Sequence, residues 1–391
     1  MKSLIPIGPF HPLQEEPELF LLELEGETVV GIDIQLGYNH RGIEKLAEFK
    51  SYEQITFLVE RICGICSNSH PLAYVQAVEE IIGCEVPRRA LYIRAVIAEL
   101  ERIHSHLLWL GLAGHFLGYN TVWMWAWKYR EPVLEVLELL TGNRNHYAMM
   151  KIGGVRRDIE RKNVEKVLKV LKDLEGKLRE LSQAILDDPV LHLRLKGIGV
   201  LSKEDIREYG ALGPTARASG VEIDVRKNHP YSVYNEVEWR MITQESGDVF
   251  GKVVVRCLEC FESVKIIQQC LEKMPAGEID ALVKEIPAGE GIGQVEAPRG
   301  EVFHYVCSDG SNQPIRHKIR APSYMNIPTC RVSVQGAKLA DAVLILAGID
   351  PCYCCTERLG VVDYRSKEWV MSGEDLVRLS QAKTERIKRE I

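Results

Sequence analysis

The sequence has little that would direct it to nucleic acid or into a membrane. Its 391 residues hold 49 Lys and Arg against 55 Asp and Glu, so the net charge of -6 offers no basic surplus for a polyanion. Residues 1–6 include no apolar run long enough for a signal peptide, and the chain shows no internal repeat or low-complexity segment. The hydrophobic fraction of 46% is typical of a globular protein with a large core. We therefore expect a soluble protein that does not bind nucleic acid.

An uninterrupted apolar run of membrane-spanning length is also lacking, although residues 107–127 come close to one. A span needs roughly 20 predominantly apolar residues. This run contains three glycines and the pair Asn120-Thr121, which is typical of a helix start. The break favours two buried core helices over a membrane span.

What the sequence does have is cysteine, eleven residues in all. Without a signal peptide, a reducing setting is expected, in which thiols remain available as metal ligands rather than forming disulfides. Two Cys-x-x-Cys pairs lie near opposite ends of the chain: Cys63 and Cys66, followed by His70, and Cys352 and Cys355. Each pair lies beside Gly or Pro at the end of a predicted helix. We expect the fold to close around a metal held by four thiolates, which select zinc, iron-sulfur, copper(I) or nickel-type centres.

One Cys-x-x-Cys alone is weak evidence, because it also fits a zinc half-site, a redox dithiol or core packing. Cys257 and Cys260 have the same spacing inside an apolar helix, and we expect them to be core residues. A structural zinc site would satisfy the spacing of the outer pairs. Four buried thiolates with anionic ligands would, however, require cations nearby. Arg299 and Arg320 are the candidates, with an ordinary surface position as the alternative for each.

Helix signals dominate the rest of the chain. Helices are expected at residues 51–62, 70–82, 87–112, 121–140, 158–186, 202–209, 236–274 and 336–346, and strands at 19–24, 28–34 and within 294–317. The predicted fold class is mainly α with small β-sheets around a central bundle of long helices. We divide the chain into a β-rich segment (1–36), a helical body with both cysteine motifs (37–358) and a tail (359–391).

Six motifs, taken together, resemble one family. They are residues 8–12, 37–45, 61–70, 296–301, 320–323 and 350–358. Their order is similar to that in the large, catalytic subunit of membrane-associated, energy-converting nickel-iron hydrogenases of the group 4 type. That subunit is homologous to the quinone-site subunit of respiratory complex I. Complex I relatives lack the complete set of four cysteines, so the resemblance implies a hydrogenase rather than a metal-free descendant, and a nickel-iron hydrogenase large-subunit fold.

The resemblance implies a role for each cysteine. Cys63 and Cys352 would be terminal nickel thiolates, and Cys66 and Cys355 would bridge nickel to an iron that carries carbon monoxide and two cyanides. Nickel would act as the Lewis acid that polarises dihydrogen. The thiolate of Cys352 would be the base that takes the proton.

Two further residues are expected to act in catalysis. Glu44 would be the first proton relay, since a buried carboxylate can take and pass a proton. The alternative for Glu44 is an ion pair with Arg41 or Lys45. Arg299 would lie over the open coordination face, where it could polarise dihydrogen or hold the diatomic ligands.

Three residues are expected to support the metal centre. His70 would donate a hydrogen bond to a bridging thiolate and so tune the metal. The alternative for His70 is a helix-start residue with no contact to the site. Pro298 and Thr329 lie where relatives line the cyanide pocket.

The resemblance also implies partners. The chain shows no convincing ligand set for an iron-sulfur cluster, so a small iron-sulfur subunit should supply it. Ferredoxin is the expected electron partner, directly or through other subunits, together with membrane subunits that move protons or sodium ions. The chain would lie peripherally on the cytoplasmic side of the cell membrane. Two alternatives remain: a metal-free quinone-reducing or coupling subunit of a complex I-like oxidoreductase, and a zinc-structured interaction protein.

Overall fold

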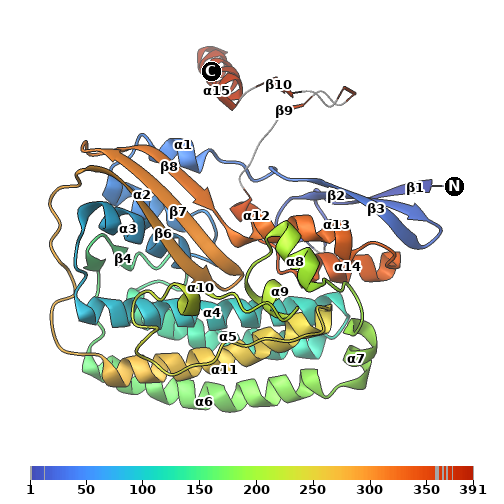
Figure 1. Ribbon diagram of the computed structural model, residues 1–391, viewed down its shortest axis with the longest axis horizontal. Helices are drawn as coiled ribbons and strands as arrows, with labels where there is room; N and C mark the ends of the chain where they lie inside the picture. The colour runs from blue at the N-terminus through green and yellow to red at the C-terminus, as the bar shows by residue number, and fades with distance from the viewer. Residues whose placement is uncertain are drawn as a thin grey trace.

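A bundle of long helices forms the base of the molecule (Figure 1). The computed structural model describes residues 2–12, 14–356, 361–362, 365–366, 369–371 and 373–390. The bundle helices are α4 (Arg88–Phe116), α5 (Asn120–Thr141), α6 (Arg161–Leu186) and α11 (Val249–Lys273). Helix α4 is buried along most of its length because α5 and α11 pack against it. Helix α6 is amphipathic and buries only its apolar stripe, as an outer helix does.

Two antiparallel sheets lie on the side of α4 that faces away from α6 and α11 (Figure 1). The first consists of β1 (Lys2–Ile7), β2 (Leu19–Glu25) and β3 (Thr28–Gln35), and the second of β6 (Ala288–Ala297), β7 (Gly300–Asp309) and β8 (Pro314–Arg320). Helix α3 (Ser69–Ile82) packs on β6 and β7. A Cβ at Gly293 would lie only 1.8 Å from the Ala73 carbonyl oxygen. Glycine at this position therefore allows α3 to approach the second sheet closely.

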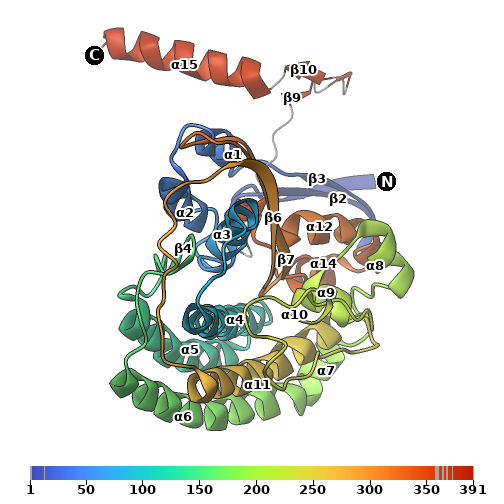
Figure 2. The same ribbon diagram turned by 60° about the vertical axis from the view of Figure 1, so that its left-hand side comes forward.

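Shorter elements lie between these layers. They are α1 (Ile43–Ala47), α2 (Tyr52–Glu60), β4 (Met150–Lys151), β5 (Gly154–Val155), α7 (Pro189–Leu195), α8 (Lys203–Tyr209), α9 (Gly213–Arg217), α10 (Val225–Asn228), α12 (Pro322–Asn326), η1 (Ile327–Thr329), α13 (Cys330–Ser333), α14 (Leu339–Gly348) and η2 (Tyr353–Cys355). The tail contains β9 (Val361–Val362), β10 (Trp369–Met371) and α15 (Gly373–Glu390). Ser51 caps α2 in a capping box with Gln54, and Ser202 caps α8 with Asp205 in the same way. Helix α15 lies apart from the rest of the molecule (Figure 2).

The predicted fold class is confirmed: the chain is mainly helical with small antiparallel sheets. Residues 107–127 contain the end of α4 and the start of α5, as the break at Asn120 predicts. Across the part of the chain that the structure describes, no helix has both the length and the apolar character to cross a membrane. The three-part division of the chain remains a prediction.

One helix start differs from the prediction by more than ten residues, while the other helix boundaries differ by only a few. The sequence predicts a helix over residues 236–274, but α11 begins only at Val249. The carboxylate of Asp248 accepts a hydrogen bond from the Gly251 amide and so forms the N-cap. Gly247, just before it, has a φ of 63°, a left-handed conformation outside the helical range. The cap and this backbone turn together fix the helix start.

Candidate metal centre

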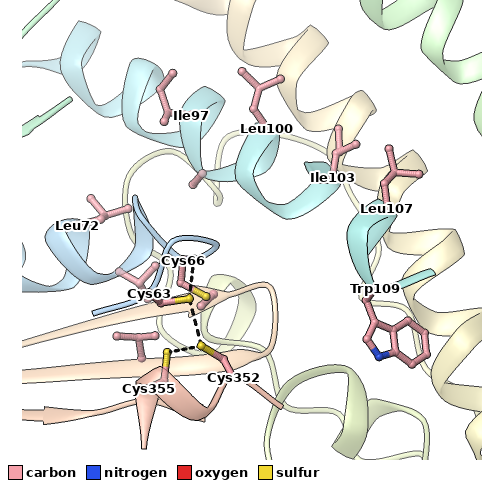
Figure 3. Close-up of a cluster of buried hydrophobic side chains, with 14 of the residues drawn as sticks. Cys63, Cys66, Leu72, Ile97, Leu100, Ile103, Leu107, Trp109, Cys352 and Cys355 are labelled. Atoms are coloured by element: carbon pink, nitrogen blue, oxygen red, sulfur yellow. Dashed lines mark hydrogen bonds between the residues drawn. The ribbon is translucent and has the colours of Figure 1, made fainter. Parts of the chain in front are cut away.

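The two cysteine pairs meet in the interior. Cys63 and Cys66 lie in the turn between α2 and α3, whereas Cys352 and Cys355 follow α14. The Cys352 sulfur lies 3.2 Å from that of Cys63 and 3.1 Å from that of Cys355, and these three sulfurs all lie within 4.8 Å of one another. Cys66 lies beside Cys63 (Figure 3). All four side chains are buried, so the folded chain brings together four soft donors from its two ends.

The surroundings of Cys63 favour a thiolate. The backbone amides of Ile65 and Cys66 donate hydrogen bonds to its sulfur over 3.3 and 3.2 Å. Hydrogen bonds from neighbouring thiols, with that of Cys352 first, hold the pKa of Cys63 well below its usual range. A thiolate is the form that binds a metal, so this corner of the cluster is prepared for one.

One arginine faces the thiols, as the charge argument predicts. Arg299 is 2% exposed, and its Nη1 lies 3.9 Å from the Cys66 sulfur and 3.2 Å from the Ser105 hydroxyl. Its Nη2 forms an ion pair with Asp350 over 2.7 Å, and its Nε donates to the Asp350 carbonyl. The cation is therefore fixed on one side by a carboxylate and presented to sulfur on the other.

Buried polar contacts hold the turn that carries Arg299. Arg102 of α4 donates to the carbonyl oxygens of Ala297 and Glu296 over 3.1 and 2.6 Å. The side-chain amide of Asn326 donates to the Arg299 carbonyl over 3.3 Å. These donors occupy the backbone acceptors on both sides of the turn, so the position of the Arg299 side chain is set by the fold.

The second predicted arginine lies elsewhere. Arg320 pairs with Glu301 on the neighbouring strand β7 and is not brought to the thiols. Both side chains of this pair are partly exposed, so solvent helps to stabilise the Arg320 cation there. Cys257 and Cys260 are buried in α11, and burial raises the pKa of Cys257 to about 12. They are thiols of the core, as predicted.

Arg41 connects the two cysteine motifs, a role that the sequence did not reveal. Its guanidinium donates to the carbonyl oxygens of Arg61 and Ile62, over 2.7 and 2.8 Å, and of Cys354, over 3.3 Å. The same cation thus contacts the backbone before the first pair and inside the second. This contact helps to hold the two segments in register around the sulfurs.

Glu44, the predicted proton relay, lies on α1 at the edge of the second sheet. Among the described residues, its carboxylate forms ion pairs with Lys318 over 3.2 Å and Arg316 over 3.5 Å. Both of these ion partners are on β8. The pairing leaves the relay role itself a prediction.

Two acidic residues near the centre were missed from the sequence. The Glu16 carboxylate accepts a hydrogen bond from the Cys354 amide over 2.6 Å. Its neighbour Glu15 is exposed on the rim of the site, close enough to Arg299 and Asp350 to feel their charges. The protein atoms around the Glu15 carboxyl raise its pKa to about 7, against the opposing effect of Arg299. Its place three residues after the 8–12 motif was the only signal for it in the sequence.

A third carboxylate, on α4, holds the segment that directly follows the first cysteine pair. Glu101 of α4 accepts hydrogen bonds from the backbone amides of Asn68 and Ser69 and from the Ser69 hydroxyl. It thereby satisfies the free amides at the start of α3, where no side chain of the helix itself acts as a cap. Burial raises the pKa of Glu101 to about 8. The position of Glu101 in the long, mostly buried helix α4 was a usable signal, because buried carboxyl groups are rare unless they are paired.

The three remaining predicted residues are all buried. His70 is fully buried, with its Nε2 3.7 Å from the Cys355 sulfur, so it does contact the site. Pro298 is buried in the turn before Arg299. Thr329 is buried and donates its hydroxyl hydrogen to the Asn326 carbonyl over 2.6 Å. The pocket roles of Pro298 and Thr329 remain predictions, and Glu357 and Arg358 of the second motif lie outside the described residues.

A binuclear metal centre fits this donor set. The donors are sulfur only, and the buried cation Arg299 offsets part of the negative charge that four thiolates would carry. Within the described part of the chain, the cluster of Cys63, Cys352 and Cys355 is the group of potential ligands that converges closely enough for a metal ion.

Known proteins match the chain over nearly its whole length. Residues 41–112 match the nickel-dependent hydrogenase family, and residues 117–286 and 281–358 match the 49 Kd subunit of respiratory-chain NADH dehydrogenase. The membrane-bound hydrogenase subunit alpha of Pyrococcus furiosus is 43% identical over 98% of this chain and 93% of its own length. The carbon monoxide-induced hydrogenase of Rhodospirillum rubrum is 42% identical over 90% of this chain and 99% of its own.

Relatives outside the hydrogenases are also similar. A subunit of the NADH-quinone oxidoreductase of Sinorhizobium medicae is 37% identical over 89% of this chain and 93% of its own length. Among solved structures, a chain of the membrane-bound sulfane sulfur reductase, an archaeal respiratory membrane complex, superposes with a TM-score of 0.87 at 34% identity. That match covers 91% of this chain and 98% of the other.

Proposed function

Because this chain belongs to the family that unites the large subunits of membrane-bound nickel-iron hydrogenases with the 49 kDa subunit of complex I, we propose that it is a hydrogenase catalytic subunit. Its reaction is the evolution or oxidation of dihydrogen. One observation carries the proposal: four buried thiols from the two ends of the chain converge beside a buried arginine. A subunit that had lost the metal would gain nothing from this costly grouping.

In this proposal, Cys63, Cys66, Cys352 and Cys355 hold a nickel-iron pair whose iron carries carbon monoxide and two cyanides. When bound, the pair supplies the Lewis acid that polarises dihydrogen. The sulfur of Cys352 takes and returns the proton. Its position in the buried interior excludes water that would compete for that proton.

The other residues orient and move charge around the sulfurs. Arg299 presents its guanidinium to the open face, where Asp350 keeps it in place. Pro298 and Thr329 line the pocket of the diatomic ligands. Glu44 passes the proton from the sulfur to solvent. Glu15 is the competing candidate for that step, because it is exposed and close enough to Arg299 and Asp350 for their charges to affect its pKa.

Partners complete the reaction. Electrons leave through an iron-sulfur cluster in a small partner subunit and reach ferredoxin, directly or through other subunits. Membrane subunits couple the transfer to the movement of protons or sodium ions on the cytoplasmic side. Support comes from relatives that are named as subunits of membrane-bound complexes.

Metal content and isotope exchange test the proposal in the purified complex. Nickel and iron near one of each per chain, with exchange between deuterium gas and water protons, are the expected results. Cys352→Ser should lower the exchange rate by at least about a thousandfold, since it removes both a metal ligand and the base. Cys354→Ser is the matched control, because this neighbouring thiol is outside the converging cluster. Loss of exchange in both variants, or in neither, contradicts the assignment.

A second function is supported by the similarity to the NADH-quinone oxidoreductase subunit. In that case the chain is a metal-free quinone-reducing or coupling subunit, and the same analysis finds no nickel. Zinc alone would instead indicate an interaction protein with a structural metal. The complete set of four thiols favours the hydrogenase over both.

A further inference from the structure

Three buried histidines extend from one of the cysteines into the second sheet. The His70 Nε2 lies 3.7 Å from the Cys355 sulfur, and the His70 Nδ1 lies 3.0 Å from the Nε2 of His304. The Nδ1 of His304 in turn lies 3.0 Å from the Nε2 of His317. All three rings are fully buried. The contacts form a continuous chain: His70 and His304 each make a contact through both ring nitrogens, and His317 makes one through Nε2.

The fold fixes the three rings independently of the cysteines. His70 is the second residue of α3, and His304 and His317 lie on the adjacent strands β7 and β8, where Val306 pairs with His317. His304 and Val306 therefore face the same side of the sheet, together with His317. The close approach of α3 to β6 at Gly293 brings the start of α3 within reach of this face.

The rings must carry their protons in one common pattern. Full burial disfavours the charged form of each ring, and two ring nitrogens only 3.0 Å apart need a donor on one side and an acceptor on the other, so each ring has one N–H and one bare nitrogen. If two neighbouring rings held opposite tautomers, two bare nitrogens or two N–H groups would face each other. A buried hydrogen bond would then be lost. Only a shared tautomer satisfies both contacts between rings.

The sulfur selects which tautomer is shared. A metal-bound thiolate at Cys355 can only accept, so His70 must carry its hydrogen on Nε2. The Nδ1 of His70 is then the acceptor for His304, and the Nδ1 of His304 is the acceptor for His317. The Nδ1 of His317 is left bare, and it has no hydrogen-bond partner among the residues that the structure describes.

We propose that His304 and His317 are positioning residues for Cys355: through their hydrogen bonds they reinforce the His70 tautomer that donates from Nε2 to the sulfur. The inference rests on the proposed function only in that a bound metal makes Cys355 a thiolate. Tyr74 packs against the rings, with its centroid 5.2 Å from that of His317, and so restricts their rotation. The array thus fixes the hydrogen that His70 donates to the sulfur.

Infrared spectroscopy of the metal-loaded complex tests the effect on the sulfur. A hydrogen bond withdraws electron density from a thiolate, and hence from a metal bound to it. Replacing His304 by Leu should therefore move the carbon monoxide and cyanide bands to lower wavenumber. His304→Gln should restore them, because an amide can donate to His70 and accept from His317. His229→Gln, at an exposed site, is the control and should leave the bands unchanged.

Nitrogen-15 NMR of the metal-free chain tests the array without any metal. The ring nitrogens should report one tautomer shared by His70, His304 and His317, and His304→Leu should uncouple His70 from His317. Mixed tautomers in the unaltered chain, or bands that His304→Leu does not move, would overturn the proposal. If His304→Leu does not fold, His317→Phe is used in its place. A chain with no carbon monoxide bands but a shared tautomer would refute the proposed function and leave the array supported.

Discussion

Removal of the buried cation beside the thiols should destabilise the protein strongly, because it strands a carboxylate. Arg299→Leu takes away the partner that lies 2.7 Å from Asp350, in an environment where both side chains are 2% exposed. Breaking a buried ion pair by deleting one member typically costs about 3–5 kcal/mol. The remaining group must either stay charged without compensation or take up a proton.

Here the cost should lie at the lower end of that range. Arg256 lies 3.7 Å from the other oxygen of Asp350, so a cation remains nearby. At an effective dielectric constant of about 20, the attraction is about 6 kcal/mol across the shorter distance and about 4.5 across the longer one. We expect Arg299→Leu to cost about 3 kcal/mol, which lowers the melting temperature of a chain of this size by about 4 °C.

A double-mutant cycle in urea, on the metal-free chain, is the assay. Arg299→Leu and Asp350→Asn should each destabilise, and the double variant should recover about 2 kcal/mol relative to their sum. The control is Arg320→Leu, whose pair with Glu301 is nearer solvent and should be worth no more than about 1 kcal/mol. Strict additivity of Arg299→Leu and Asp350→Asn would refute the argument that this pair holds the cation at the thiols.

Three other predictions concern protons and packing. Glu44→Gln should slow deuterium exchange at least about tenfold with the metals retained; if Glu15→Gln slows it and Glu44→Gln does not, the relay is Glu15. Burial raises the pKa of Glu101 from 4.5 to about 8, so the folded chain keeps a proton that the unfolded chain releases between those values. Its stabilising contribution is complete below pH 4.5 and falls through that window by up to about 1.4 kcal/mol per pH unit, a slope that Glu101→Gln should remove from urea unfolding. Gly293→Ala, with its Cβ 1.8 Å from a carbonyl oxygen, should cost at least about 2 kcal/mol, whereas Gly289→Ala, 3.3 Å from the Ile81 side chain, should cost less.

The cysteine pairs could be predicted because their signal is local. Spacing of three residues beside Gly or Pro identifies Cys63 and Cys352 as members of converging pairs before any fold is known. Arg299 followed from charge, since buried thiolates need a cation. That reasoning could not distinguish Arg299 from Arg320, because the difference depends on tertiary packing, which buries Arg299 beside Asp350 and the thiols and leaves Arg320 partly exposed beside Glu301.

The supporting groups could not be predicted for a similar reason. Glu101 caps a helix that begins more than thirty residues earlier in the chain, so the contact exists only once α3 and α4 are packed. Arg41 reaches the carbonyl of Cys354, at the opposite end of the sequence. Helix patterns similarly predicted α11 but not its start, because the cap at Asp248 overrides the apolar periodicity before it. Local propensity thus predicted the elements, and tertiary contacts set their limits and partners.

X-ray absorption at the nickel edge of the purified complex tests the central claim most directly, because it counts the ligands of the metal itself. If Cys63, Cys66, Cys352 and Cys355 hold a nickel-iron pair, nickel will be present, surrounded by sulfur donors and with iron as a near neighbour. A chain without nickel, or nickel bound only by nitrogen and oxygen, would contradict the account.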